Sequence, residues 1–356
     1  MHKFNILSGN PSYISYADGD QITEIICILS EAFRKWQDKV PYIVIAGKHG
    51  NPCGAAIDWT SPDIALTKAL LGNTVAIMGG EIITNFPIDK YLGELLLSPP
   101  KGIDIGRKNW GLDIVFAPEF SEDTIEIVGR REKRRLLANP ALVESPLTTD
   151  PWMFRKLRGS WLRQKVSPFI LTPDEVQYNT GASLSETDFS TLLLAWAVCW
   201  RASSNTVTLA KDMQLIGVGC GQQDQIECVR LCINRARAAG HSVKNAFFAS
   251  DAFFPYATSK GSKISKEFFD SLKILLECVD ADGDPAKVRR ILTDDIAGSI
   301  IAQDKREGTE LLLDAGCKGG VVPADGQNLE KVQAFFKENG LSVCFVEKNN
   351  RGFSKH

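Results

Sequence analysis

Short apolar runs alternate with longer amphipathic stretches along most of the chain. PYIVIAG (41–47) and LDIVFAPE (112–119) have the length and apolar content of strands, whereas DQITEIICILSEAFRKW (20–36) has apolar residues at helical spacing. Strands this apolar are typical of sheets covered on both faces, so the alternation predicts an α/β fold. Strands are expected at 41–47, 74–83, 112–119, 206–212, 213–219, 245–250 and 342–348, and helices at 20–36, 61–73, 121–134, 185–202, 226–240, 264–315 and 328–340.

The alternation occurs twice, once on each side of a segment with a different composition. Residues 140–183 are rich in Pro, Thr and Ser, which is typical of connecting segments. We therefore predict a first half at 1–150, a connector at 151–183 and a second half at 184–356 with a helical insertion at about 257–307. Two α/β halves indicate a pseudo-duplicated architecture, although the sequence contains no clean repeat.

Charge and hydropathy exclude several classes of protein. The 356 residues carry a formal net charge of −2, so the chain has no basic field for nucleic acid or an anionic membrane. No apolar run is long enough to span a bilayer, and the N-terminus MHKFNILSGN lacks a signal-peptide layout. The nine cysteines include no C-x-x-C pair, which indicates a reduced, cytoplasmic protein. The four histidines form no cluster, so no metal is expected.

GKHGNPCG (47–54) is the first segment that could carry chemistry. It is expected to form a loop after a strand, where α/β folds place their sites. The ammonium of Lys48 favours the neutral imidazole of His49, which can act as a general base. An exposed lysine beside a structural histidine explains the pair equally well. A zinc deaminase site does not, because Ala56 stands where a second cysteine would follow Cys53 and no H-x-E is present.

Two further segments could bind a ligand. GVGCGQQDQ (217–225) lies between an expected strand and helix, where glycines and a helix N-terminus can approach an anion. Its G-x-G-x-G spacing differs from the dinucleotide fingerprint, and Asp224 at the helix start would repel a phosphate. ASDAFFPY (249–256) could form an apolar wall for a flat heterocycle. A strand end packed in the core is the favoured alternative for that segment.

Together the three segments resemble AICAR transformylase, the formyltransferase part of a bifunctional enzyme of purine biosynthesis. GKHGNPCGAA, SSNTVTLAKDMQLIGVGCGQQ and ASDAFFPY occur in the family's order, and SYISYAD, DIVFAPEFSED and RGFSKH agree with its flanking pieces. The resemblance implies two cytidine-deaminase-like α/β/α halves without zinc and a homodimer with active sites between its subunits. It also implies 10-formyltetrahydrofolate as co-substrate. The IMP cyclohydrolase domain that usually precedes this region is missing from the sequence, so ring closure to IMP is not expected.

The resemblance also assigns roles to individual residues. His49 would take the proton from the acceptor amine, Lys48 would stabilise the developing oxyanion, and Asn205 would position the reacting groups. The other matched positions fall into two sets. Those for the acceptor are Ser15, Gly79, Asp113, Asp224, Gln225, Phe253, Arg351 and Phe353, and those for the folate are Met78, Pro255 and Tyr256.

Several positions depart from the family's pattern. Asp224 and Gln225 stand where the family has a serine and the arginine that faces the acceptor's phosphate, and Ser15 stands where it has asparagine. A desolvated phosphate without arginine partners is bound weakly. After FFPY, the residues ATS at 257–259 lack the acid that would contact the pterin. The catalytic pair is thus kept while the contacts to the rest of the substrates are altered.

We therefore expect a formyltransferase whose acceptor is an aromatic or heteroaromatic amine with altered phosphate recognition. The second hypothesis is a stand-alone AICAR transformylase in which other arginines, such as Arg230 or residues of the insertion, replace the lost one. The third is a folate- or ligand-binding relative without turnover. Retention of both Lys48 and His49 argues against the third.

Overall fold

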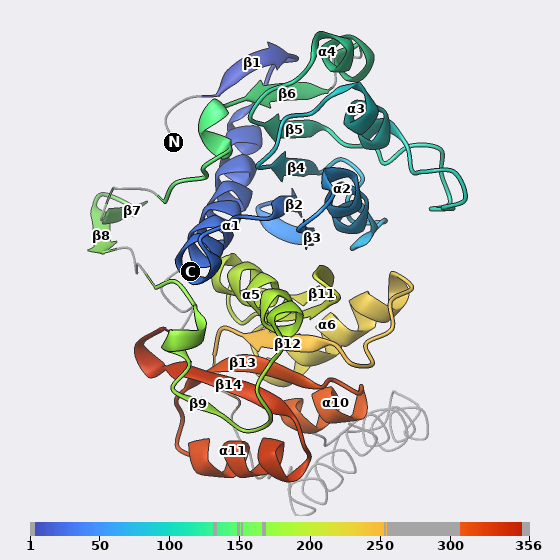
Figure 1. Ribbon diagram of the computed structural model, residues 1–356. Helices are drawn as coiled ribbons and strands as arrows, with labels where there is room; N and C mark the ends of the chain where they lie inside the picture. Colours follow the sequence, from blue (N-terminus) through green and yellow to red (C-terminus); the bar gives the residue numbers. More distant parts are fainter. Residues whose placement is uncertain are drawn as a thin grey trace, which may run out of the picture.

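One long mixed sheet with helices on both faces forms the frame of the protein (Figure 1). The computed structural model describes residues 4–130, 134–147, 150, 152–165, 169–252, 254 and 307–350. The predicted α/β class is confirmed. In spatial order, the strands of this twelve-stranded sheet are β1 (Asn5–Ser8), β6 (Arg135–Ala138), β5 (Ile114–Ala117), β4 (Glu81–Thr84), β2 (Tyr42–Lys48), β3 (Asn51–Asp58), β11 (Gln214–Gly219), β10 (Val207–Lys211), β12 (Phe247–Ser250), β13 (Gly319–Ala324), β14 (Ser342–Glu347) and β9 (Tyr178–Asn179).

The strand order repeats itself in the two halves of the sheet. In the first half, the antiparallel hairpin β2–β3 is followed by the parallel strands β4, β5 and β6, and antiparallel β1 closes the edge. In the second half, the hairpin β10–β11, the parallel strands β12, β13 and β14, and antiparallel β9 take the same places. The halves join where β3 pairs with β11 at Ala56 and Gln214. The pseudo-duplication is therefore present in the topology without a repeat in the sequence, and the boundaries at 150 and 184 stay predictions.

Helices cover the two faces of the sheet in different ways (Figure 1). On one face, two helices share a single core with strands of both halves, whereas the other face has a separate core for each half. The shared core contains α1 (Tyr13–Gln37) and α5 (Glu186–Arg201). The separate cores contain α2 (Pro62–Leu71), α3 (Lys90–Leu97) and α4 (Glu122–Gly129) in the first half, and α6 (Gln225–Ala238), α10 (Gly308–Asp314) and α11 (Leu329–Glu338) in the second. Among the helices in the described ranges, none is both long and apolar enough to cross a membrane.

The helix α5 is the centre of the shared core. Every side chain from Phe189 to Trp200 is buried, so this helix is enclosed on all sides by protein. Its N-terminus is capped as the sequence predicts, with the Asp188 N–H donating to Ser185 Oγ at 3.1 Å. The interpretation of its apolar stripe as core is confirmed.

The helix α1 begins earlier than the predicted range of 20–36. Its first residue is Tyr13, because Ser12 and Ser15 form a capping box that stabilises an additional N-terminal stretch of helix. The Ser12 hydroxyl accepts the Ser15 N–H at 3.3 Å, and the Ser15 hydroxyl accepts the Ser12 N–H at 3.0 Å. This extension places Asp18 beside the β2–β3 turn, where a Cβ at Gly50 would lie 3.5 Å from its Oδ1.

The predicted strand at 74–83 is wrong over most of its length. Only β4 is a strand, and the residues before it form turns. Asn73 Oδ1 accepts the Ala76 N–H at 2.9 Å, and Gly79 has a φ of +73°. A side-chain hydrogen bond and a left-handed glycine therefore break a run whose apolar content is typical of a strand.

The predicted connector has secondary structure of its own. The strands β7 (Trp152–Lys156) and β8 (Trp161–Lys165) form a separate hairpin, and β9 adds to the outer edge of the second half beside β14. The connector thus completes the second half of the sheet as well as linking the halves. The predicted insertion at 257–307 lies outside the described residues apart from Glu307.

Candidate active site

The Lys48–His49 pair lies on a tight hairpin turn. Lys48 and Asn51 pair as the last residue of β2 and the first of β3, so only His49 and Gly50 form the turn. Their φ angles are +54° and +69°, the left-handed pair of a type I′ turn. The expectation of a loop through 47–54 is wrong, because the residues after the turn continue directly as β3. A left-handed histidine is uncommon, and such conformations cluster at functional sites.

The ammonium of Lys48 is held against backbone that follows α2. Its Nζ donates to the Met78 carbonyl at 2.5 Å. The neighbouring Gly79 donates its N–H to the Gly111 carbonyl at 2.7 Å, and a Cβ at this glycine would lie 3.8 Å from Lys48 Nζ. The structure therefore brings Lys48 together with Met78 and Gly79, which the resemblance assigns to the folate and acceptor pockets.

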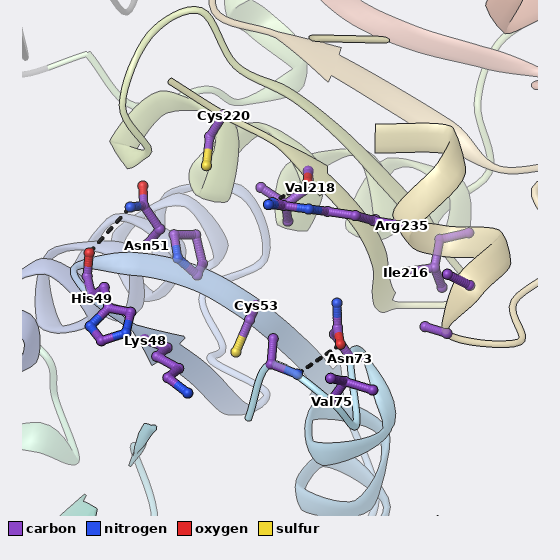
Figure 2. Close-up of a pocket in the computed structure, with 16 residues that line it drawn as sticks. Lys48, His49, Asn51, Cys53, Asn73, Val75, Ile216, Val218, Cys220 and Arg235 are labelled. Carbon is purple, nitrogen blue, oxygen red and sulfur yellow. Dashed lines mark hydrogen bonds between the residues drawn. The ribbon is translucent and has the colours of Figure 1, made fainter. Parts of the chain in front are cut away.

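A cleft of about 600 Å³ opens beside this turn at the junction of the two halves (Figure 2). One wall comes from the turn, the start of β3 and the residues after α2, and the opposite wall comes from β11 and α6. Three basic side chains, Lys48, His49 and Arg235, line this cleft. No Asp or Glu lies among the described residues that line it. The cleft therefore attracts anionic groups.

A buried carboxyl group lies behind the turn. Glu81 pairs with Gly47 across β2 and β4, is 3% exposed, and its Oε1 has no hydrogen-bond partner in the described parts of the chain. Burial above all, and then the charge of Asp18, raises the pKa of Glu81 to about 8, against the opposing effect of Lys48. Glu81 is consequently mostly protonated at neutral pH and places little negative charge beneath the lysine.

The two cysteines in the cleft are poor nucleophiles. Burial raises the pKa of Cys53 to about 12, and burial also raises the pKa of Cys220. A thiol needs a lowered pKa to attack as thiolate at neutral pH. The chemistry of the cleft therefore rests on its nitrogen-bearing side chains.

Two predicted acceptor contacts take part in local structure instead. Asp224 is the N-cap of α6, where its Oδ1 accepts the Glu227 N–H at 2.8 Å. Gln225 is 6% exposed and donates from Nε2 to Ser250 Oγ at 2.6 Å. Neither side chain lines the cleft. The start of α6 therefore presents a carboxylate and no cation to a ligand.

Three other predicted residues also lie outside the lining of the cleft. Asn205 donates from Nδ2 to the Gln222 carbonyl at 3.0 Å. The buried hydroxyl of Ser15 belongs to the capping box of α1. The charge of Asp113 acts on Glu81, and its Oδ2 is 3.9 Å from Arg135 Nη1. None of these three side chains lines the cleft.

The remaining predicted positions lie outside the described residues, so the structure does not place them. They are Phe253, Pro255, Tyr256, Arg351 and Phe353. Within the described ranges, no group of three or more His, Cys, Asp and Glu could hold a metal ion.

Three residues of the site were not singled out by the sequence. Arg235 falls in a helical run whose charges are typical of a solvated face, and Asn51, whose Nδ2 donates to the His49 carbonyl at 3.2 Å, reads as part of a turn. Glu81 offered the clearest signal, because it is the one carboxylate in the apolar run TVAIMGGEII and buried acids are rare. The position of Arg235 opposite the turn depends on how the two halves meet.

Comparison with known proteins supports the resemblance seen in the sequence. Residues 1–235, about two thirds of the chain, match the family model described as AICARFT/IMPCHase bienzyme. The chain belongs to this family. The matched region of the AICARFT/IMPCHase bienzyme family includes the Lys48–His49 turn and Asn205, and it extends to Arg235 in the cleft wall.

Members of the AICARFT/IMPCHase bienzyme family from several bacteria are similar to this chain. The bifunctional purine biosynthesis protein PurH of Chlorobium phaeobacteroides is 31% identical over 246 residues, 69% of this chain and 42% of the relative. Its counterpart from Caldicellulosiruptor bescii is 30% identical over 248 residues, 70% and 43%, and that from Bacillus cereus is 32% identical over 212 residues, 60% and 38%. The chain thus spans about two fifths of the length of these curated relatives.

Proposed function

We propose that this protein transfers a formyl group from 10-formyltetrahydrofolate to the amine of a small aromatic or heteroaromatic acceptor similar to AICAR. The observation that carries the proposal is the Lys48–His49 pair, set on a rigid turn beside a basic cleft in a chain of the AICARFT/IMPCHase bienzyme family. The relatives are named for purine biosynthesis, which supports this class of acceptor. The repeated strand order supports two cytidine-deaminase-like halves, and we propose a homodimer with sites between subunits.

The reaction forms one C–N bond and breaks another. The acceptor nitrogen attacks the formyl carbon, and the carbonyl oxygen becomes an oxyanion. His49 takes the proton that the attacking amine loses and returns it to the departing folate nitrogen. A positioned base contributes about 10²–10⁴-fold to such a step. Lys48 stands next to it with its ammonium anchored at Met78, where it would stabilise the oxyanion.

Recognition of a phosphate on the acceptor is where this chain differs from the family's pattern. The carboxylate of Asp224 already satisfies the N-terminus of α6, and Gln225 is buried against Ser250. We therefore propose that the acceptor is either not phosphorylated or has its phosphate bound elsewhere. An AICAR transformylase is the second candidate, and it is favoured by the presence of Arg235 in the cleft.

Formyl transfer to AICAR, to its riboside and to its free base tests these alternatives. Faster transfer to the riboside or base supports altered acceptor recognition. A strong preference for AICAR itself identifies the second candidate. If no compound is formylated although the folded protein binds 10-formyltetrahydrofolate, the chain is a ligand-binding relative without turnover and the proposal is wrong.

A further inference from the structure

The cleft has a cationic group opposite the Lys48–His49 turn. Arg235 projects from α6 along β11, with its guanidinium beside Val218 and below Cys220 (Figure 2). Its Nη1 donates to the Val218 carbonyl at 3.1 Å, and it also hydrogen-bonds the Cys220 thiol. These contacts to β11 fix the direction of the side chain. The residue itself remains exposed to solvent.

The guanidinium has donors to spare. It carries five N–H groups in a planar fork, and the Val218 carbonyl and Cys220 thiol account for only part of them. Among the described residues, no carboxylate forms an ion pair with Arg235. A fork of this kind matches the two oxygens of a phosphate or carboxylate. The wall of the cleft therefore presents N–H donors to which an oxyanion of a bound ligand can hydrogen-bond.

The start of α6 cannot take that role. Its N-terminal N–H groups face the fixed carboxylate of Asp224, which repels a second anion. Arg235 lies ten residues beyond Gln225, which corresponds to about 15 Å along the helix axis. The cation available to a ligand has therefore moved from the beginning of α6 to its last turns, where the cleft is.

We infer that Arg235 anchors a phosphate or carboxylate of a molecule bound in this cleft, with the reacting part of that molecule directed toward Lys48 and His49. The inference rests on the proposed function for the identity of that molecule. A ribotide acceptor carries a phosphate, and the folate donor carries the carboxylates of its glutamate tail. Arg235 acts on affinity and orientation and does not touch the reacting atoms.

Inorganic phosphate tests the anion site without any assumption about the reaction. Melting temperatures are measured in phosphate and in chloride at equal ionic strength for the wild type, Arg235→Gln, Arg235→Lys and Arg237→Gln. Arg237 is an exposed arginine of the same helix that does not line the cleft, so it is the matched control. Phosphate is expected to stabilise the wild type and Arg237→Gln, to stabilise Arg235→Lys less, and to leave Arg235→Gln unchanged. An equal response of Arg235→Gln and Arg237→Gln overturns the inference.

Calorimetric dissociation constants then identify the source of the anion. One pair of ligands is AICAR and its riboside, and the other is a stable folate analogue with and without its glutamate. Arg235→Gln should weaken the charged member of one pair by at least about tenfold and leave the uncharged member within about twofold. If phosphate discriminates among the variants but none of the four ligands binds, the proposed function is wrong and the anion site stands. If all four bind wild type and Arg235→Gln equally, the anion site is wrong and the proposed function stands.

Discussion

Two hairpin turns at the centre of the sheet have the same backbone and different surroundings. In the first half Lys48–Asn51 closes β2 and β3, and in the second half Lys211–Gln214 closes β10 and β11. Each begins with a lysine, and the two central residues of each have positive φ. The equivalence follows from the repeated topology, in which both hairpins precede the same set of parallel strands.

Hydrogen bonds from neighbouring elements hold both central residues of the second turn. Lys68 of α2 donates from Nζ to the Asp212 carbonyl at 3.0 Å, and the Ile57 N–H donates to the Met213 carbonyl at 3.1 Å. On the other side of the junction, α6 directs Arg235 to β11, and within the described part of the chain no hydrogen bond joins it to the first turn. Lys68 thus joins α2 to the second turn, whereas Arg235 points to β11 and leaves a cleft beside the first turn.

Substitution of one central residue in each turn is the strongest way to break this comparison. Asparagine tolerates the left-handed region, so His49→Asn and Asp212→Asn should keep both hairpins folded. His49→Asn is expected to lower kcat for formyl transfer by about 10²–10⁴-fold, because the proposed general base is lost. Asp212→Asn should leave kcat within about twofold. Equal rates for the two variants, with equal melting temperatures, would remove His49 from the chemistry.

The packing of each hairpin on its helix should tolerate an added methyl group equally poorly in the two halves. A Cβ at Gly54 of β3 would lie 2.1 Å from the Ala69 carbonyl of α2, and one at Gly219 of β11 would lie 2.2 Å from the Cys228 carbonyl of α6. Backbone atoms must shift to accept either methyl group, so Gly54→Ala and Gly219→Ala should each cost about 3 kcal/mol in urea denaturation. A large cost for one variant alone would show that the helices are not equivalently packed.

The residue opposite the hairpin differs between the halves and should give the first a pH dependence. Glu81 pairs with Gly47 where Phe247 pairs with Ala210. Burial raises the pKa of Glu81 from its ordinary value of 4.5 to about 8 in the folded protein, so its favourable contribution is complete below pH 4.5 and is lost as the pH rises toward 8. In urea denaturation, Glu81→Gln should lose about 2 kcal/mol less of its free energy of unfolding than the wild type between pH 5 and pH 9. Glu94→Gln, on the exposed face of α3, is the control and should follow the wild type. Parallel curves for Glu81→Gln and wild type would contradict the assignment.

Breaking the hydrogen bond between Lys68 and the second turn is expected to have the smallest effect. Lys68→Met keeps the length of the side chain but removes the donor to the Asp212 carbonyl, which should cost about 1 kcal/mol of stability. Turnover should not change, because the second turn lies away from Lys48 and His49. Lys90→Met, at the exposed start of α3, controls for loss of a surface charge. A fall in kcat for Lys68→Met alone would show that both turns serve the reaction.

Local patterns in the sequence were sufficient for the elements that depend on local interactions. The cap at Ser185 and the apolar run of α5 predicted a core helix, and Ser121 predicted the start of α4, where its side chain accepts the Thr124 N–H. The range 74–83 failed because a turn set by Asn73 and glycines carries apolar side chains. Apolar content alone does not distinguish such a turn from a strand.

The sequence predicted only the part of the candidate site that lies in recognisable motifs. The motif around Lys48 and His49 identified the pair, because the family's pattern is kept there. The sequence did not indicate that the pair sits on a two-residue turn, since Asn51 and the residues after it read as a loop but pair with β2 as a strand. Arg235 and Glu81 were missed because both act from elements far from the motif in sequence.

The amino-acid sequence alone thus determined the α/β class and the family and singled out Lys48 and His49 as the candidate catalytic pair, since periodicity, caps and motifs are written in neighbouring residues. Tertiary structure decided what these parts become. Pairing of β3 with β11 sets the two hairpins side by side, and the directions of Lys68 and Arg235 then close one junction and leave a basic cleft at the other. The strand pairing and the Lys68 hydrogen bond join residues more than a hundred positions apart, and no local pattern encodes them.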